Sequence, residues 1–422
     1  MTIKTKSLFF LIPLISILWS INSYPGTNSA LNLNSIIEEA LKNNPQIQAA
    51  KERFAAAKAR VTLLRSLEDP KFEYEYDKIT ADMDAVMNGS TAPMRTFAVS
   101  QEVPFPTKLF FRKQSAQKEA NSFEQEYKET ERKVVKEVKE AYFQLFLSSK
   151  KISVTKENLD LVSQFVEIAN KKYSVGQTTQ QDVLRAQVEY SKLSNQLVLF
   201  EQEEKISKSM LNSLLSRELD ADVSVDGAKN NKDLELNEDK LVSLTKESRP
   251  ELKSFREMLK KSKIDLTLAN QEYLPDFMVK YKREEKDGKA GSWAGMVGVT
   301  FPLWFFDKQN SFVKEAKANV EVARAEYQAT ENMVIFESKS ALARFQAAKN
   351  LVKIYETGVL PQAQAALETA RLTYQADKIG LLEVLDSQRT LRDFQIEYFE
   401  SLANLEIALA DLERAVGADL GK

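Results

Sequence analysis

The chain has 422 residues, with 59 lysines and arginines against 61 aspartates and glutamates, and a formal net charge of −2. This balance provides no basic excess for binding nucleic acid or an anionic membrane surface. There is no cysteine and no histidine. Their absence excludes disulfides, thiolate and imidazole metal sites and the commonest general base, so we expect no enzyme, no cofactor and no bound metal.

Residues 1–30 have the pattern of a secretory signal peptide. Lys4 and Lys6 precede an apolar segment from Leu8 to Trp19, and small polar residues follow. This order of segments is typical of exported proteins. A short membrane anchor is the alternative, but the apolar segment is shorter than the ~18 residues that a spanning helix needs. We therefore predict a signal peptide over 1–30, cleaved between Ser23 and Ala30.

The remainder of the chain contains a tandem duplication. Four landmarks recur in the same order, at spacings of 205, 205, 198 and 201 residues, and the pairs are Pro45/Pro250, Pro70/Pro275, Pro104/Pro302 and Tyr173/Tyr374. Collinear matches at a nearly constant spacing indicate an internal repeat. We place the first repeat at 31–226, the second at 227–418 and a short C-terminal tail at 419–422.

Each repeat contains two segments in which apolar and polar residues alternate. They lie at about 71–79 and 95–103 in the first repeat and at about 276–283 and 293–301 in the second, with polar loops at 78–94 and 283–292. Alternation over roughly ten residues is typical of tilted transmembrane strands, and aromatic residues mark their ends. We predict that one face contacts lipid through Phe72, Tyr74, Tyr76, Phe97, Val99, Phe277, Val279, Tyr281, Val297, Val299 and Phe301.

Two interpretations of these strands remain open. A soluble hairpin lying on a helical body would show the same alternation. In lipid, four strands cannot close a barrel, and open sheet edges are not tolerated there. The membrane interpretation therefore requires several chains. Two chains would give eight strands and a filled interior, whereas three chains would give twelve strands and leave room for a conduit.

Long segments without glycine or proline predict unusually long helices. No glycine or proline lies between Pro106 and Gly176, between Gly176 and Gly227, or between Pro302 and Gly358. These segments are rich in good helix formers. A helix of about 65 residues would be on the order of 100 Å long, which is far beyond the length of a globular helix.

The ordered set of motifs resembles the TolC family of outer-membrane efflux channels, over about residues 32–418. The resemblance lies in the repeat, in the strand exits VPFP (103–106) and FPL (301–303), and in the paired segments KYSVGQTTQQDVLRAQ (172–187) and TYQADKIGLLEVLDSQ (373–388). It implies a mainly α fold with a small β part. Long antiparallel coiled-coil-like helices would form an α-barrel tunnel, and four amphipathic strands per chain would join a trimeric 12-stranded transmembrane β-barrel.

The resemblance also implies a function. The protein would be a passive homotrimeric duct in the outer membrane of a Gram-negative bacterium, extending into the periplasm. It would receive cargo from an inner-membrane pump of the resistance-nodulation-division type and a periplasmic adaptor protein. The cargo remains open among drugs, metal ions and polypeptides. A periplasmic coiled-coil scaffold with soluble hairpins is the alternative function.

The resemblance places the functional residues at two turns, near 173–180 and 374–381, where antiparallel helices join. Glu383 and Asp386 would form acidic rings at a periplasmic gate, although a solvated acidic helix start has the same pattern. Asp182 and Arg185 occupy the matching first-repeat positions, as a latch or as a surface pair. Asp377 stands where the family commonly has glycine, and aspartate still permits a tight turn. We predict adaptor docking at Val175, Gly176, Gln177, Thr178, Lys378, Ile379 and Gly380.

Overall fold

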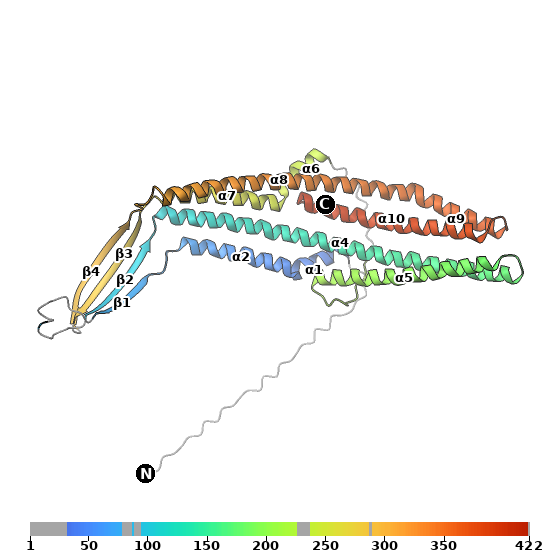
Figure 1. The fold of residues 1–422 in the computed structure, drawn as a ribbon, viewed down its shortest axis with the longest axis horizontal. Coiled ribbons are helices and arrows are strands. Elements are labelled where there is room, and N and C mark those ends of the chain that lie inside the picture. Colours follow the sequence, from blue (N-terminus) through green and yellow to red (C-terminus); the bar gives the residue numbers. More distant parts are fainter. Residues whose placement is uncertain (1–31, 78–86, 88–93, 226–236, 287–288, 421–422) are drawn as a thin grey trace, which may run out of the picture.

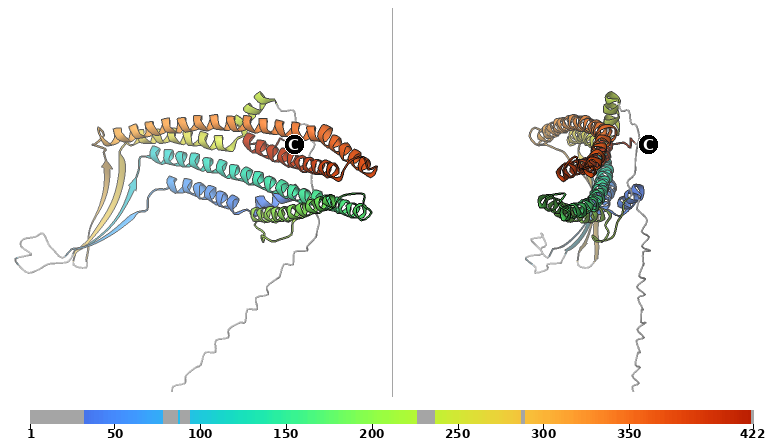
Figure 2. Two further views of the ribbon diagram at one scale, coloured as in Figure 1. Left: turned by 45° about the vertical axis from the view of Figure 1, so that its right-hand side comes forward. Right: turned by 90° about the vertical axis from the view of Figure 1, so that its right-hand side faces the viewer.

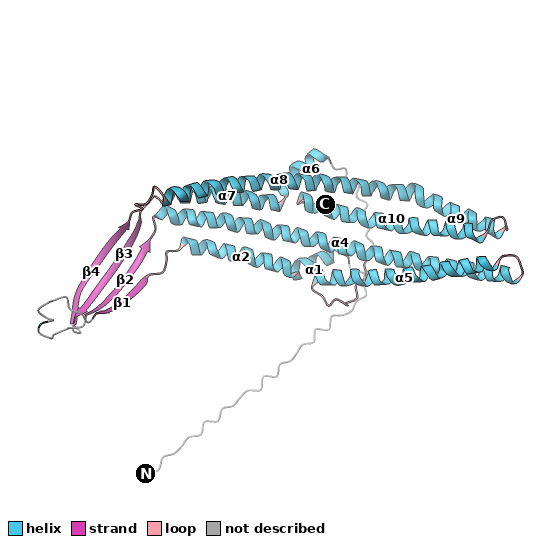
Figure 3. Cartoon of the chain, in the orientation of Figure 1, coloured by secondary structure: helices cyan, strands magenta, loops and turns pink. Residues whose placement is uncertain are grey.

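The computed structural model describes residues 32–77, 87, 94–225, 237–286 and 289–420. The expected signal peptide and its cleavage site lie outside these residues. The molecule is long and narrow, with a small sheet at one end and helices filling the rest of its length (Figures 1 and 3). Among the described residues, no helix combines the length and the apolar character needed to cross a membrane.

The two halves of the chain have the same order of elements. The first half contains α1 (Leu33–Asn43), α2 (Pro45–Arg65), β1 (Lys71–Asp77), β2 (Met94–Val103), α4 (Pro106–Ser174) and α5 (Gln180–Leu215). The second half contains α6 (Glu238–Ser248), α7 (Pro250–Gln271), β3 (Asp276–Lys286), β4 (Lys289–Thr300), α8 (Lys308–Ile354), a π-helical turn (Tyr355–Val359), α9 (Leu360–Gln375) and α10 (Leu381–Val416). The π-helical turn carries Gly358 and precedes Pro361, so the helix continues past both residues.

The four strands form one antiparallel sheet in the order β1-β2-β3-β4. The register pairs Phe72 with Val99, Val99 with Tyr281 and Val279 with Val297, so the predicted lipid-facing residues within the strands share one face. Phe301 follows the last residue of β4. On the other face, the ion pair between Lys280 and Glu73 (2.6 Å) spans β2 from its two neighbours. The small β2 residues Thr96, Ala98 and Ser100 are buried on that face. The sheet therefore has an apolar face and a charged face.

The strands β3 and β4 are longer than the sequence predicts. Residues 283–292 are predicted as a loop, whereas the structure pairs Arg283 with Trp293 and continues pairing to Lys286 and Lys289. The register shifts between Arg283 and Glu285. A Cβ at Gly291 would lie 2.6 Å from the carbonyl oxygen of Glu284, so only glycine fits this bulge. The prediction was wrong here because the bulge interrupts the alternation.

The helices form a curved layer that continues the sheet. Near the sheet the packing order is α2-α4-α7-α8, and near the opposite end it is α5-α4-α10-α9. Seen along the long axis, this layer curves like part of a cylinder wall (Figure 2). Its lateral edges expose apolar side chains, among them Leu184, Val188, Val198, Leu199, Ile206 and Met210 of α5 and Met333, Phe336 and Ile354 of α8.

Glu406 provides a pH-dependent test of the packing of α10. Burial raises the pKa of its carboxyl to about 7, the Lys139 charge opposes this rise, and Glu413 adds to it. The folded state therefore retains a proton that the unfolded state loses near pH 4.5. The contribution of the Glu406 carboxyl to the free energy of unfolding is fully present below pH 4.5, and it is lost as the pH rises through about 7.

We expect Glu406→Gln to stabilise the protein at pH 8 by about 2–3 kcal/mol and to have little effect at pH 4.5. Unfolding midpoints of detergent-solubilised protein measured across this pH range test the prediction. The exposed Glu52→Gln variant is the control, and its difference from wild type should not vary with pH. A Glu406→Gln difference that is equally independent of pH would contradict the assignment.

Candidate functional site

The two predicted turns adopt the same backbone geometry 201 residues apart. In the first turn Gly176 has φ 75°, and in the second Asp377 has φ 56°. The amide of Gly176 donates to the Tyr173 carbonyl (3.0 Å), and the amide of Asp377 donates to the Tyr374 carbonyl (3.1 Å). The prediction that Asp377 preserves a tight turn is confirmed. Both turns lie at the end of the molecule opposite the sheet (Figure 1).

The residues predicted to dock an adaptor are mostly accessible. Val175, Gly176 and Gln177 of the first turn and Lys378 and Gly380 of the second are exposed. Thr178 is half-buried because its hydroxyl donates to the Asp182 carboxylate (2.7 Å). Ile379 is half-buried and packs against an apolar cluster beneath the turns. An incoming protein would therefore meet mainly the exposed residues.

Asp182 stabilises its own turn. Its carboxylate accepts hydrogen bonds from the hydroxyls of Thr178 and Thr179. The Asp182 amide donates to the Thr179 hydroxyl, and the Thr179 amide donates to the Asp182 carboxylate, so the two residues form a capping box at the start of α5. The hydrogen bond from Thr178 is the main reason that the pKa of this carboxyl is lowered. Arg185 is exposed and forms no ion pair with Asp182 in the structure. The surface pair is therefore not formed within this chain, and a latch from these two residues onto a neighbouring turn stays a prediction.

Glu383 and Asp386 lie on the first two turns of α10, and both are exposed. The spacing of three residues places them on one helix face. A Cβ at Gly380 would lie 3.0 Å from Oε2 of Glu383, so this carboxylate folds back over the helix start. Asp386 is 3.7 Å from Arg389 and keeps most of its surface in solvent. Both carboxylates are available to line an opening.

A buried ion cluster connects the two helical hairpins near the turns. Glu189 of α5 is only 3% exposed. It accepts a hydrogen bond from Arg389 of α10 (2.8 Å) and lies 3.5 Å from Arg392. Burial raises the pKa of the Glu189 carboxyl, but the two guanidinium groups outweigh burial and lower it. The carboxylate is therefore ionised and bound from the second repeat.

Glu189, Arg389 and Arg392 are not among the predicted site residues, although α5 carries a signal for this cluster. Val183, Ala186, Glu189 and Leu193 share one face of α5, and all four are buried. An acidic residue on an apolar face requires a partner, because isolated buried charge is costly. The partner could not be identified from the sequence, since Arg389 is 200 residues away along the chain.

A second link joins the turns themselves. Nζ of Lys172, at the end of α4, is 2.5 Å from a carboxylate oxygen of Asp377 and 4.3 Å from the centre of the Tyr374 ring. Asp377, at the position that Gly176 occupies in the first turn, thus supplies a counter-charge for the first hairpin. Two ionic links, one exposed and one buried, hold the hairpins together at this end.

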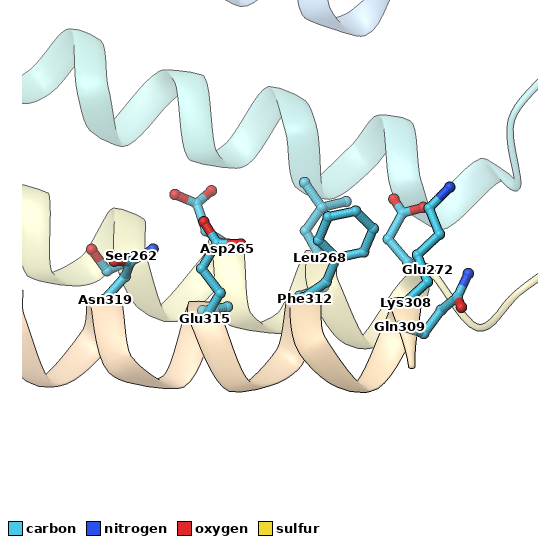
Figure 4. A pocket seen from close by; sticks show the side chains of 11 residues that line it. Ser262, Asp265, Leu268, Glu272, Lys308, Gln309, Phe312, Glu315 and Asn319 are labelled. Atoms are coloured by element: carbon cyan, nitrogen blue, oxygen red, sulfur yellow. The ribbon is translucent and has the colours of Figure 1, made fainter. Parts of the chain in front are cut away.

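A groove of about 490 Å³ lies between α7 and α8, close to the sheet. Its carboxylates include Asp265, Glu272 and Glu315 (Figure 4). Asp265 accepts a hydrogen bond from Ser115 and pairs with Lys261, and Glu272 pairs with the buried Lys108. No acidic cluster capable of holding a metal ion occurs among the described residues. The contacts of Ser115 and Lys108 attach α7 to α4, whereas the Lys261–Asp265 pair lies within α7.

Comparisons with known proteins agree with this architecture. The family model described as "Outer membrane efflux protein" matches residues 36–217 and 241–418. The cobalt-zinc-cadmium resistance protein CzcC of Cupriavidus metallidurans is 22% identical over 67% of each chain. The outer membrane protein TolC of Vibrio cholerae is 21% identical over 92% of this chain and 91% of its own length. The CmeC outer membrane channel of Campylobacter jejuni has a TM-score of 0.80 at 18% identity, covering 98% of this chain and 94% of its own.

Proposed function

Because the chain belongs to the outer membrane efflux protein family, a family of transport channels rather than of enzymes, we propose that it acts as a passive duct gated at its helical turns. The protein is an outer-membrane channel of a tripartite efflux system in a Gram-negative bacterium, and it works as a trimer with a periplasmic adaptor and a resistance-nodulation-division pump.

The unpaired edges of the sheet and of the helical layer support the proposal of a trimeric duct. β1 and β4 each pair on one side only within the chain, and the helical layer ends in exposed apolar side chains on α5 and α8. Three copies would join β1 of one chain to β4 of the next and bury these apolar edges. The apolar face with Phe72, Val297 and Phe301 would then contact lipid, and the charged face would line a water-filled interior.

At the other end, we propose that Glu383 and Asp386 line the narrowest part of the duct. Threefold symmetry converts each residue into a ring of three carboxylates, which attracts cations. The ionic links of Glu189 and Lys172 would hold the hairpins together in the closed state. Adaptor contact at Val175, Gly176, Gln177 and Lys378 would act directly beside these links.

The native mass of the detergent-extracted protein tests the duct. We expect a mass near three mature chains in the outer-membrane fraction, measured by light scattering with the detergent contribution subtracted. A monomer or dimer that is released without detergent would refute the barrel and favour the periplasmic scaffold instead.

The acidic rings are tested by conductance in planar bilayers. Because the rings concentrate cations, we expect Glu383→Ala/Asp386→Ala to lower the preference for cations over anions severalfold. The matched control is Glu167→Ala, an exposed acid on α4 near the same end. Equal selectivity in wild type, double variant and control would exclude these carboxylates from the duct wall.

A further inference from the structure

A second cavity, of about 960 Å³, lies halfway along the helices. It is lined by residues of α1, by the middle of α4, by the start of α7 and by the end of α10. In Figure 2, α1 and the C-terminus lie on the convex side of the curved layer. The cavity is therefore on the outer side of the wall, away from the concave side that would enclose the duct.

The charges that line this cavity are unbalanced. Six lysine and arginine side chains line it, against three acidic ones. Four of these cations already have a carboxylate partner: Lys128 pairs with Glu124 (2.6 Å), Lys136 with Asp411 (3.3 Å), Lys139 with Glu413 and Arg414 with Glu129 (3.1 Å). Each of the three acidic residues also has a partner: Glu413 pairs with Lys139, Glu131 accepts a hydrogen bond from Tyr127, and Asp419 has an interaction of its own.

Arg132 and Lys253 remain without a counter-charge. Neither forms an ion pair with a carboxylate in the part of the chain that the structure describes, and both are half-buried. Burial and the nearby charges of Lys128, Arg256 and Arg132 lower the pKa of Lys253. Like charges gathered in a partly buried cavity destabilise the empty protein, and an anion bound there would remove that cost.

The start of α7 adds to the positive potential. Pro250 is the first residue of α7 and lines the cavity, so the positive end of the helix dipole is directed towards it. The volume is ample for a ligand of small-molecule size. Arg132 lies 26 residues along α4 from Pro106, which corresponds to about 40 Å. This distance from the sheet excludes a lipid headgroup.

We propose that this cavity binds a soluble anion carrying two or more phosphate or carboxylate groups, held by Arg132 and Lys253 with Lys128 at the rim. The site is independent of the gate, because it lies outside the duct and far from the turns. A multivalent anion would also connect α4 of the first repeat to α7 of the second, and would stabilise their packing.

Isothermal titration of the detergent-solubilised full-length protein with inorganic pyrophosphate, at low salt, tests the proposal. We expect saturable binding with one site per chain and an affinity that falls with added salt. The double variant Arg132→Gln/Lys253→Gln should bind about tenfold more weakly or worse, because two charged hydrogen bonds are lost. Lys133→Gln, an exposed residue next in the chain, should bind like wild type.

Thermal unfolding supplies a second measurement that does not depend on the titration. Without ligand, the double variant should fold and unfold at the same temperature as wild type or higher, because repulsion has been removed. Pyrophosphate should raise the midpoint of wild type and leave that of the double variant unchanged. Citrate, tested in parallel, distinguishes carboxylate from phosphate ligands. No saturable binding of either probe, or equal binding by the double variant, would overturn the site.

Discussion

Replacing Arg249 with methionine should destabilise the protein by about 3–5 kcal/mol and reduce the yield of assembled protein in the outer membrane. The side chain of Arg249 is completely buried. Its guanidinium lies 2.9 Å from Glu251, 3.1 Å from Glu337 and 3.5 Å from Glu129, and it donates to the carbonyl of Arg414. Removing this one cation leaves carboxylates of three helices without their shared partner.

The position of Arg249 makes compensation difficult. It immediately precedes α7, and its partners lie on α4, α7, α8 and the end of α10. A Cβ at Gly417 would lie 2.7 Å from Cα of Arg249, so the backbone just after α10 packs directly against the backbone of Arg249. Burial already raises the pKa of the Glu129 carboxyl against the opposing charges of Arg249 and Arg414. Loss of Arg249 would therefore force protonation of Glu129 or local unfolding.

Unfolding midpoints in detergent and outer-membrane yields measure this effect. Arg60→Met is the matched control, since Arg60 is exposed and forms a single contact with Glu119 at 3.4 Å. Such a surface pair contributes less than about 1 kcal/mol. If Arg249→Met were as stable as the control, the buried network would have no role in holding the four helices together.

The substitution Glu189→Gln should lower stability by about 2 kcal/mol or more and increase single-channel conductance. Glu189 is the only carboxylate, among the described residues, that pairs with both Arg389 and Arg392. Without it, Arg392 retains the Asp393 contact (2.7 Å), while the ionic link from α5 to α10 is lost and only their apolar packing remains. Weakening that connection should let the hairpins separate where the duct is proposed to close.

A double-mutant cycle with Arg389→Gln identifies the interaction. If the two side chains act through one contact, the double variant should be less destabilised than the sum of the two single variants, by a coupling energy of about 1–3 kcal/mol. Conductance and unfolding midpoints should follow the same order. The exposed Glu167→Gln should leave both unchanged. A conductance that stays at the wild-type level in Glu189→Gln would remove this link from the gate.

Much of the architecture was accessible from local patterns. Alternation identified the apolar face of the sheet, because successive strand residues point to opposite sides. Glycine-free and proline-free segments identified α4 and α8, since the residues that break helices are absent from them. The positive φ at Asp377 was also predictable, because a glycine occupies the equivalent position in the first repeat. The first two properties depend on neighbouring residues only, and the third depends on the internal repeat, which the sequence also shows.

The links between the repeats depend on the tertiary structure. Nothing near Glu189 specifies Arg389, and nothing near Arg249 specifies Glu129, because each partner lies more than a hundred residues away. The hydrogen bonds of Asp182 within its own turn are likewise seen only in the folded structure, and so is the bulge at Gly291. The sequence by itself determined which face of each element is apolar and where the long helices turn. Only the packing of one repeat against the other decided which buried charges meet, because that choice depends on distances in space and not on spacing along the chain.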